Sequence, residues 1–373
     1  MVSRHAPATR ITSGRVVGEA VRHQSSGVNH PSADLAVDDR CPGATTQGMR
    51  TAVIGTGTWG TAMAVILARM DRPVVLWGRD PAKTATLDRE RQHPQLPGVV
   101  LPADLRITAD PTDLVGCDLI FWAVPTQHTR AIASILPLPA GVPVVSLSKG
   151  LEQTTLLTVT GILGETYPDR PYGALSGPSH AEEVMAGHPV VLAAAGPDEV
   201  GRLLVERLHG RACRLYTTTD LRGVELGGAL KNVVAVAAGI AEGLGLGDNL
   251  KAALITRGLA EIRRLGRAAG AQDVTFAGMA GIGDLLTTCY SRHGRNRALG
   301  LAIASGENPL AFLRRQATVA EGAWTCRAAT ALAAQYGVDL PLSTQVEAVI
   351  WRDAPVQAAL DALFARSPKE EDA

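Results

Sequence analysis

The chain has 373 residues, of which 46% are hydrophobic, so it can form sizeable cores and should hold about two domains. Lys and Arg together number 36, as do Asp and Glu, which gives a formal net charge of zero. A balanced chain has no long-range field that would draw it to nucleic acid or to an anionic membrane surface. We therefore expect a globular protein in which any basic site is local.

The five cysteines are widely scattered, and no two of them have the spacing of a zinc site or of a disulfide framework. Reduced thiols in a cytoplasm fit this pattern best, and we expect no bound metal. The apolar run at residues 233–241 ends at Glu242, well short of the roughly 20 residues that a membrane-spanning helix needs. The sequence therefore predicts no membrane span.

Residues 1–48 mix Arg, His, Ser, Gly, Pro and Asp without periodicity, and they lack the apolar stretch of roughly 7–15 residues that directs secretion. We expect this segment to be a disordered leader. Met49 directly precedes a predicted strand, which leads to the hypothesis that translation starts there. A leader peptide found by mass spectrometry of the native protein would refute it. At the other end, residues 367–373 are charged and are expected to fray.

Between residue 49 and residue 220, short apolar strands are separated by helical stretches. The predicted strands are residues 51–54, 73–77, 118–124, 142–146 and, less clearly, 190–194, with a helix at residues 61–69. This alternation predicts an α/β domain that has a parallel sheet with helices on both faces. After about Leu221 the pattern changes to long segments rich in Ala, Leu and Gly, such as 227–243 and 250–269. We therefore expect an all-helical second domain over residues 221–366.

A glycine motif lies between the first predicted strand and the first predicted helix. Gly55 can form the tight turn, Gly57 lets the backbone approach a pyrophosphate, and Gly60 permits close packing of the helix on the strand. The phosphates would lie at the positive end of the helix. This context predicts a Rossmann-type dinucleotide-binding domain over residues 49–220, against the alternative of a glycine-rich turn without a ligand.

The end of the second predicted strand bears on the choice of dinucleotide. Its sequence is Trp77-Gly78-Arg79-Asp80, and Arg79 can pair with a 2′-phosphate or stack on adenine. NADPH is therefore somewhat favoured over NADH. Asp80 could instead bind the ribose hydroxyls of NAD, and Arg79 could be a solvated surface cation, so both readings stay open.

A lysine stands at the start of the second domain, within the apolar, glycine-rich segment 225–233. Desolvation in such surroundings lowers the pKa of an ammonium, which would let Lys231 act as an acid or base near neutral pH. Asn232 beside it can donate to a substrate oxygen. Lysines on helices are more often surface residues, and that alternative remains.

Two further polar groups follow. Asp284 comes after the glycine stretch 278–283 and could orient a lysine ammonium or a substrate hydroxyl. Arg292, Arg295 and Arg297 fall within six residues, which suits a dianionic phosphate, although a solvated basic loop explains them equally well.

Two loops of the first domain follow strand ends, at residues 146–152 and 176–182. In open α/β sheets the ligand crevice lies beyond the carboxyl ends of the strands, so both loops should border the site. Lys149 could meet a substrate oxygen or phosphate, while Ser179 and the backbone of Gly177 could shape the pocket.

Seven ordered motifs between about Met49 and Arg366 closely resemble the NAD(P)-dependent glycerol-3-phosphate dehydrogenase family. They are Gly-Thr-Gly-Thr-Trp-Gly-Thr-Ala (55–62), Ser-Lys-Gly-Leu-Glu (148–152), Ser-Gly-Pro-Ser (176–179), Leu-Lys-Asn (230–232), Gly-Asp-Leu-Leu-Thr-Thr-Cys (283–289), Gly-Arg-Asn (294–296) and Ala-Glu-Gly (320–322). The resemblance implies interconversion of dihydroxyacetone phosphate and sn-glycerol 3-phosphate, which supplies phospholipid synthesis. It also implies a homodimer with a Rossmann-type domain followed by a helical substrate domain.

The resemblance implies roles for individual residues. Lys231 resembles the catalytic acid and base. The implied substrate contacts are Lys149, Gly177, Ser179, Lys231, Asn232, Asp284, Thr288, Gly294, Arg295 and Asn296. The implied NAD(P) contacts are Gly55, Gly57, Thr58, Trp59, Gly60, Arg79, Lys149, Ala181, Arg295, Val319 and Glu321. Arg295 is expected to hold the phosphate of the substrate.

The sequence departs from the family pattern in three places. His180 stands where Phe is common, and Gly294 replaces a Ser whose hydroxyl could contact substrate. The 48-residue leader carries none of the motifs. Two other functions stay open: a related two-domain hydroxy-acid dehydrogenase, and a dinucleotide-binding sensor without catalysis. Retention of Lys231, Asp284 and Arg295 together argues against the sensor.

Overall fold

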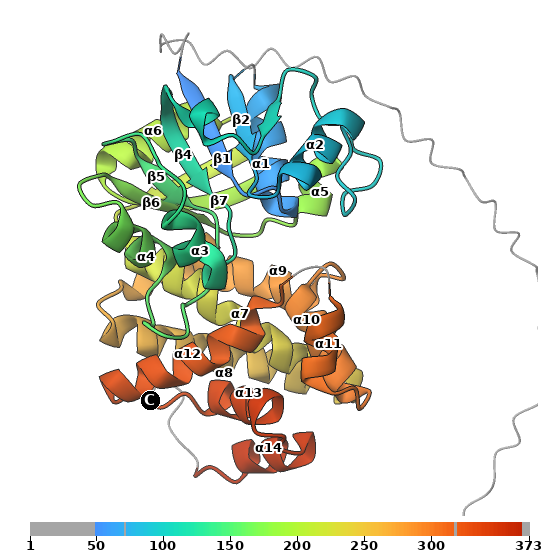
Figure 1. Cartoon of the computed structure of the whole chain (residues 1–373). Coiled ribbons are helices and arrows are strands. Elements are labelled where there is room, and N and C mark those ends of the chain that lie inside the picture. The colour runs from blue at the N-terminus through green and yellow to red at the C-terminus, as the bar shows by residue number, and fades with distance from the viewer. Residues whose placement is uncertain (1–48, 71, 317–318, 368–373) are drawn as a thin grey trace, which may run out of the picture. The chain divides into compact units, whose positions relative to one another are not determined.

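The computed structural model describes residues 49–70, 72–316 and 319–367 (Figure 1). The predicted leader lies outside the described residues, as do all but the first residue of the predicted frayed tail. The first part of the described chain forms a sheet flanked by helices, and the remainder is helical. The expected fold class is therefore confirmed.

The sheet has eight strands in the order β3-β2-β1-β4-β5-β6-β7-β8. They are β1 (Arg50–Ile54), β2 (Val74–Trp77), β3 (Arg106–Thr108), β4 (Cys117–Trp122), β5 (Val144–Ser146), β6 (Tyr172–Ser176), β7 (Val190–Ala195) and β8 (Cys213–Thr218). The chain leaves β1 towards β2 on one side and later returns to β4 on the other. This reversal beside β1 is where ligands bind in open sheets of this kind.

The sheet is mainly parallel, as expected, but one pair departs from the prediction, because β7 runs antiparallel to β6. The connection between them contains α5 (Ala181–Met185), a helix of only five residues. Such a helix rises roughly 7.5 Å, at about 1.5 Å per residue, which is too short to carry the chain back along the sheet. The next strand therefore starts from the same end, and β8 then pairs parallel to β7.

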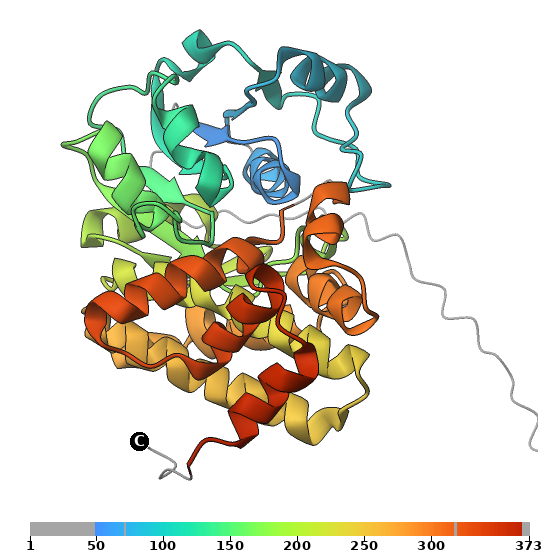
Figure 2. The same ribbon diagram turned by 60° about the horizontal axis from the view of Figure 1, so that its bottom comes forward.

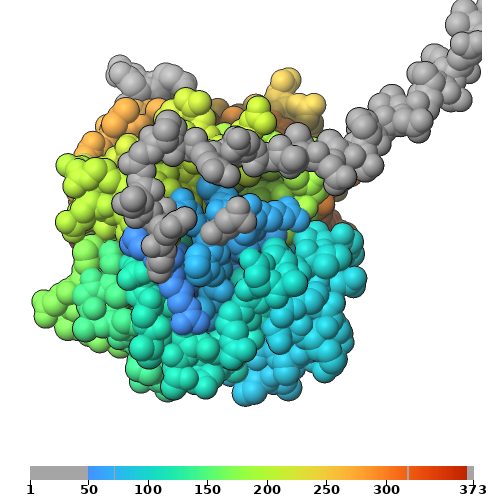
Figure 3. Space-filling view, turned by 90° about the horizontal axis from the view of Figure 1, so that it is seen from above, coloured from blue at the N-terminus to red at the C-terminus, as the bar shows by residue number. Residues whose placement is uncertain are grey.

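Helices cover both faces of the sheet, as predicted (Figure 1). They are α1 (Thr58–Arg69), α2 (Pro81–Glu90), α3 (Thr126–Ala133), α4 (Val159–Thr166), α5 and α6 (Asp198–Leu208), with a 3-10 turn η1 (Pro111–Leu114). Alternate residues of β1 enter different cores: Val53 packs with α1 on one face, while Ala52 and Ile54 pack with α3 and α4 on the other. In Figure 3 the blue to green segments of this sheet half occupy much of the near face.

The helical half is built around α7 (Leu221–Gly243) (Figure 2). Around it lie α8 (Gly247–Ala268), the short turns η2 (Asp273–Ala277) and η3 (Met279–Gly283), α9 (Asp284–Tyr290), α10 (Arg295–Ala304), α11 (Pro309–Arg315), α12 (Glu321–Tyr336), α13 (Pro341–Trp351) and α14 (Val356–Phe364). The helix α7 starts six residues earlier than the predicted segment, because the Asp220 side chain accepts from the Gly223 amide at 2.9 Å and caps it.

Length and composition alone would let α7 cross a membrane, but its apolar window is 100% buried inside the protein. It is the only such helix in the part of the chain that the structure describes. Its hydrophobicity is therefore that of a central core helix, since almost every residue from Gly223 to Ala241 packs against neighbouring helices or the sheet.

The helices α7 and α10 approach each other backbone to backbone. A Cβ added at Gly239 would meet the carbonyl oxygen of Arg297, and one added at Gly300 would meet that of Val236. Glu242 at the end of α7 also accepts two hydrogen bonds from the Arg297 guanidinium, from Nε at 2.8 Å and from Nη2. This contact fixes the start of α10, which carries Arg295, relative to α7, which carries Lys231. We refer to Gly239 and Gly300 as the glycine seam.

Candidate active site

A cleft of about 410 Å³ lies at the carboxyl ends of β1, β2, β4 and β5, between the sheet half and the helical half. Its walls bring together the glycine turn after β1, the loops after β5 and β6, and the starts of α9, α10 and α12. A concave site with a few converging polar groups, placed at this edge of an open sheet, is the expected location of a ligand.

The glycine turn has the geometry that the sequence predicts. Gly55 has a φ of +115°, and a Cβ there would approach the Ala123 carbonyl oxygen at 2.8 Å, so only glycine fits without strain. A Cβ at Gly60 would meet the Gly55 carbonyl. At Gly57 a Cβ would project into open space, and no side chain caps α1. The first amides of α1 are therefore accessible to an anion.

The end of β2 presents two cations to the cleft. Arg79 is exposed and lines it, and so does Lys83 on α2, whose Nζ lies 3.8 Å from Asp80. The Asp80 carboxylate caps α2 by accepting from the amides of Ala82 at 3.0 Å and Lys83 at 3.2 Å. The carboxylate that would bind ribose hydroxyls in NAD is thus already used by the helix.

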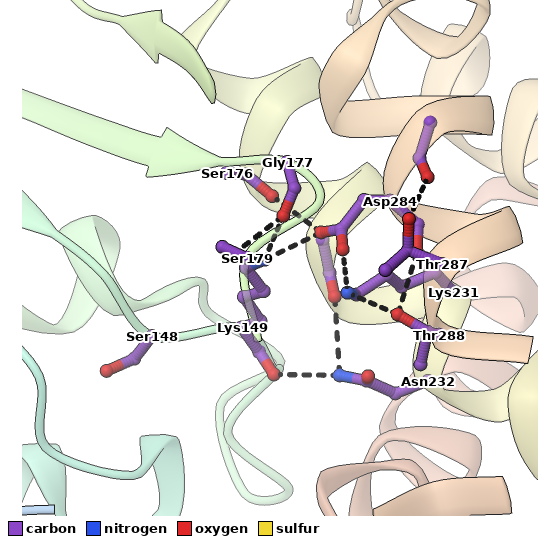
Figure 4. A network of polar contacts seen from close by, with 12 residues as sticks. Ser148, Lys149, Ser176, Gly177, Ser179, Lys231, Asn232, Asp284, Thr287 and Thr288 are labelled. Atoms are coloured by element: carbon purple, nitrogen blue, oxygen red, sulfur yellow. Dashed lines mark hydrogen bonds and ion pairs between the residues drawn. The ribbon is translucent and has the colours of Figure 1, made fainter. Parts of the chain in front are cut away.

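Deep in the cleft, one carboxylate holds two ammonium groups (Figure 4). Oδ1 of Asp284 accepts from Nζ of Lys231, and Oδ2 accepts from Nζ of Lys149 at 2.7 Å. Asp284 is 1% exposed and Lys231 is 5% exposed, so this contact is shielded from water. Because Lys149 comes from the sheet half and Asp284 from the helical half, the ion pair joins the two.

Glycines at the start of α7 make this approach possible. A Cβ at Gly227 would lie 2.7 Å from the Ala280 carbonyl oxygen, and one at Gly228 would lie 2.8 Å from Oγ of Ser176. Ser176 itself donates to Asp284 Oδ2 at 3.2 Å. The glycine pair therefore lets the sheet half and η3 contact α7 directly, one helical turn before Lys231.

The pKa values of this pair follow from its surroundings. Burial lowers the pKa of Lys231 to about 7, with the charge of Asp284 acting in the opposite direction and that of Lys149 adding to the effect. Burial alone would raise the pKa of Asp284, but the charges of Lys149 and Lys231 hold it below its usual range. Near neutral pH, Lys231 can thus both give and take a proton beside a permanent carboxylate.

Two amides and a hydroxyl complete the floor of the cleft. Thr288 Oγ1 accepts from Lys231 Nζ at 2.7 Å. Asn232 donates to the carbonyl oxygens of Lys149 at 3.2 Å and Gly228 at 3.3 Å, and its Oδ1 accepts from Asn296 at 2.9 Å. Since both N–H groups of Asn232 have protein partners, its predicted bond to substrate requires one of them to be exchanged.

The three arginines of the basic loop have different surroundings. Arg295 is exposed and lines the cleft, whereas Arg297 is paired with Glu242 behind it. Arg292 donates from Nε to the ring of His293 at 3.4 Å and does not line the cleft. The idea that all three surround one phosphate is therefore wrong, and Arg295 alone is placed to meet a ligand.

Glu321, at the start of α12, is the acidic group of the cleft wall near α3. Its Oε1 accepts from the Thr126 amide at 3.2 Å, while its buried Oε2 has no hydrogen-bond partner among the described residues. Burial raises the pKa of Glu321 to about 7, with the Thr126 bond and the charge of Arg295 acting against it. At neutral pH this carboxyl group is therefore close to the midpoint of its titration.

Of the residues predicted for the site, all except Gly177 line this single cleft. Gly177 instead accepts from Lys149 Nζ at 3.1 Å through its carbonyl, and so orients that side chain. Sequence reasoning missed Lys83 and His128, which also line the cleft. Lys83 stands four residues after Arg79, at the first turn of a helix that begins with Asp-Pro, and this spacing could have indicated it.

In the part of the chain that the structure describes, the cysteines and acidic groups form no cluster that could hold a metal ion. Cys117, Cys213, Cys289 and Cys326 are free and buried, and Cys41 lies outside the described residues. No cluster of three or more His, Cys, Asp or Glu residues that could hold a metal ion occurs within residues 49–70, 72–316 and 319–367.

A turn that can hold a pyrophosphate, facing a buried lysine that titrates near neutrality, is the arrangement of a nicotinamide-dependent dehydrogenase. Comparison with known proteins specifies the class further. Residues 50–200 match the family model for the NAD-dependent glycerol-3-phosphate dehydrogenase N-terminus, and residues 220–361 match that for its C-terminus. The chain belongs to the NAD-dependent glycerol-3-phosphate dehydrogenase family of oxidoreductases.

Individual relatives agree with this assignment and confirm the resemblance that the motifs carry. The chain is 45% identical over 328 residues to a glycerol-3-phosphate dehydrogenase [NAD(P)+] of Salinibacter ruber, covering 86% of this chain and 96% of the relative. It is 45% identical to that of Thermus thermophilus, covering 87% and 100%. Among solved structures, the glycerol-3-phosphate dehydrogenase of Coxiella burnetii superposes with a TM-score of 0.81 at 34% identity, covering 85% of this chain and 99% of that one.

Proposed function

We propose that this protein interconverts dihydroxyacetone phosphate and sn-glycerol 3-phosphate with NAD(P)H. The observation that carries the proposal is the Lys231–Asp284–Lys149 contact, buried in the cleft that the dinucleotide turn opens. The family assignment supports the substrate and the reaction. When bound, the nicotinamide supplies the hydride that C2 of the ketone accepts.

The chain's own residues would manage charge and position. Lys231 donates a proton to the oxygen at C2 during reduction and removes it during oxidation. Asp284 holds the lysine ammonium in place and stabilises its charge. Arg295 at the cleft wall binds the phosphate, whose binding energy aligns the carbonyl for attack. The other predicted contacts, among them Ser179, Asn232, Thr288 and Asn296, would surround the carbon chain.

The direct test is oxidation of NADPH and of NADH by the purified protein with dihydroxyacetone phosphate, and with unphosphorylated hydroxy-acid precursors in parallel. We expect turnover with the phosphoester. Activity only with the unphosphorylated ketones would indicate the related hydroxy-acid dehydrogenase instead, and dinucleotide binding without any turnover would indicate a sensor.

Replacement of the acid–base residue gives a sharper test. Lys231→Met should reduce turnover by roughly 10²–10⁴-fold, because proton transfer in the transition state is lost. Lys251→Met is the matched control, since Lys251 is also a buried lysine paired with a carboxylate, Glu242, but it lies outside the cleft. The control should keep turnover within about twofold. Near wild-type turnover in Lys231→Met would remove this lysine from the chemistry.

We also propose that NADPH is preferred to NADH. Arg79 and Lys83 would meet the 2′-phosphate, and Asp80 is held by the amides of α2. Arg79→Ala should raise KM for NADPH by roughly 10-fold, about the value of one charge-assisted hydrogen bond, and leave KM for NADH within about twofold. Equal changes for both dinucleotides would contradict the preference.

Further proposals concern the setting of the enzyme. We place the domain boundary near Leu221, supported by the end of β8 at Thr218 and the capping of α7 by Asp220. A homodimer, a cytoplasmic location and a role in supplying phospholipid synthesis are proposed from the resemblance. Sedimentation equilibrium of the purified chain tests the dimer, and loss of glycerol 3-phosphate in a deletion strain tests the metabolic role.

A further inference from the structure

His180 lines the cleft, yet none of the steps above uses it. It lies in the loop between β6 and α5, directly after Ser179. Its Nε2 is buried and makes no hydrogen bond with any residue that the structure describes. A buried polar atom without a partner loses its bonds to water and gains none in return, so native proteins rarely keep one without a reason.

The ring of His180 is held between the two halves of the protein. His293, in the loop before α10, packs against it with ring centroids 6.0 Å apart and planes tilted by 49°. The backbone of Thr287 on α9 and the charge of Lys231 on α7 also act on the ring. The imidazole therefore lines the same cleft as Lys231 and packs against a ring of the helical half.

Charge decides what the ring can bind. Burial, followed by the charge of Lys231, lowers the pKa of His180 below its usual value, while the Thr287 backbone, Glu183 and Glu182 act in the opposite direction. Near pH 7 the imidazole is uncharged, with one nitrogen that donates and one that accepts. Such a ring suits a neutral hydroxyl, whereas the dianionic phosphate is better served by the permanent cation Arg295 on the cleft wall.

The proposed role of Lys231, which lines the same cleft, indicates which group of the substrate His180 could bind. If Lys231 meets the oxygen at C2, the two neighbouring substrate groups are the carbon that bears the phosphate and the carbon that bears the free hydroxyl. Arg295 binds the former. His180, a neutral ring in the same cleft with a nitrogen that has no partner among the described residues, is then available for the latter.

We propose that His180 is a specificity-determining residue that forms a hydrogen bond with the free hydroxyl of the three-carbon phosphoester. The inference rests on the proposed function. A site that makes a hydrogen bond to a substrate hydroxyl discriminates against the analogue that lacks it, because the buried partner then stays unsatisfied. His180 would thereby favour dihydroxyacetone phosphate over ketone phosphates that end in a methyl group.

The test compares dihydroxyacetone phosphate with hydroxyacetone phosphate, in which a methyl group replaces the hydroxymethyl group. The values of kcat/KM are measured for both substrates with the wild type, His180→Phe and His180→Gln. Phe keeps an aromatic ring against His293 but cannot form the bond. We expect it to lower kcat/KM for dihydroxyacetone phosphate by roughly 3–10-fold and to leave that for hydroxyacetone phosphate within about twofold. Gln, which has a donor and an acceptor, should retain part of the discrimination.

His293→Phe is the matched control, because it changes the other ring of the pair. We expect it to leave the ratio of the two kcat/KM values unchanged. An equal fall for both substrates in His180→Phe would overturn the proposal, since a phosphate contact or a purely structural role would act on both. An unchanged ratio would overturn it as well. Failure of the proposed function is separate and shows as absence of wild-type turnover with dihydroxyacetone phosphate.

Discussion

The ammonium of Lys231 lies between a carboxylate that holds its proton and an apolar helix that disfavours its charge. Burial is the larger effect, and it lowers the pKa to about 7. In the proposed mechanism, reduction of the ketone requires the protonated lysine, whereas oxidation of the alcohol requires the neutral one. The same residue should therefore give opposite pH profiles in the two directions.

We predict that kcat/KM for reduction of dihydroxyacetone phosphate falls as pH rises through about 7, and that kcat/KM for oxidation of glycerol 3-phosphate rises over the same range. Asp284→Asn removes the charge that raises the pKa of Lys231, so the inflection for reduction should move to lower pH. Both profiles are measured as initial rates from roughly pH 5.5 to roughly pH 9. Inflections of the same sign in both directions would contradict the assignment.

At this scale the sequence could predict much of the site. The apolar neighbours of Lys231 along its own helix are enough to indicate desolvation. The bond from Lys149 to Asp284 joins residues 135 positions apart and depends on how two halves meet, which no local pattern encodes. Arg297 is paired with Glu242, whereas Arg295 lines the cleft. This difference depends on Glu242, which lies on another helix.

At the scale of elements, the glycine seam fixes how closely α7 approaches α10, and with it the position of Arg295, the proposed phosphate ligand at the start of α10. We predict that Gly300→Ala lowers the free energy of unfolding by roughly 1–3 kcal/mol through overpacking, because the added Cβ would meet backbone atoms that cannot rotate away. KM for dihydroxyacetone phosphate should rise with it as Arg295 shifts. Denaturant unfolding and steady-state kinetics measure the two effects.

The control for this change is Gly201→Ala on α6, where the nearest atoms to an added Cβ lie at 3.7 and 3.8 Å. It should stabilise the protein slightly, by up to about 1 kcal/mol, because Ala is the better helix former. A Gly300→Ala variant as stable as the wild type would show that α10 is free to adjust.

The Glu242 ion pair is a second feature of the same elements. The hydrogen bonds from Arg297 lower the pKa of Glu242. Burial acts in the opposite direction, but the bond from Lys251 adds to the effect of Arg297, and the pKa falls to about 2. The contribution of the pair to stability is therefore present above the ordinary carboxyl pKa and is lost as pH falls towards about 2. Glu242→Gln should lower the free energy of unfolding at pH 7 by roughly 1–3 kcal/mol, since it leaves two largely buried cations without a full partner.

Glu307→Gln is the matched control for that pair. Glu307 binds Arg315 through two nitrogens as well, at 2.8 and 2.6 Å, but the arginine side chain is 57% exposed. Exposed pairs contribute little, and we expect a change much smaller than that in Glu242→Gln. Urea titration measures the free energy of unfolding of both variants. An equal decrease in the two would show that burial of the cations does not matter.

The element pattern was predictable where segments are long and buried, as in β1, α1 and α7. It failed for β3, which has three residues, and for β8, whose exposed alternate residues resemble a loop. The antiparallel turn of β7 was also missed, because strand direction depends on the length of α5, and a short helix leaves little signal in composition.

For the whole molecule, the sheet half and the helical half have their own cores but share a boundary. A small cluster of Ala174, Ala193 and Ala195 from the sheet packs with Val224 and Ala280 from the helical half. Glu225 on α7 accepts from the amide of Thr160 at 3.0 Å and from its hydroxyl at 2.6 Å. These buried contacts couple the halves in addition to the ion pair of the active site.

We therefore predict that the two halves unfold in a single transition. Trp59, Trp77 and Trp122 report on the sheet half, and Trp324 and Trp351 report on the helical half. Variants that keep the tryptophans of only one half, with those of the other half replaced by Phe, should give melting curves by fluorescence whose midpoints differ from that of far-UV circular dichroism by no more than a few degrees. Two separated midpoints within one variant would show that the boundary is too weak to couple them.

The glycine seam has one more consequence, for engineering. If Lys231 and Arg295 have the proposed roles, the distance between them limits the length of the substrate, and the glycine seam makes that distance depend on the spacing of two main chains. Side-chain changes around the cleft can adjust affinity, but they cannot increase the distance between the main chains that carry Lys231 and Arg295. A methyl group at Gly239 or Gly300 would push the two helices apart, so an enzyme for a four-carbon phosphoester could be sought by enlarging the seam and repacking the outer face of α10.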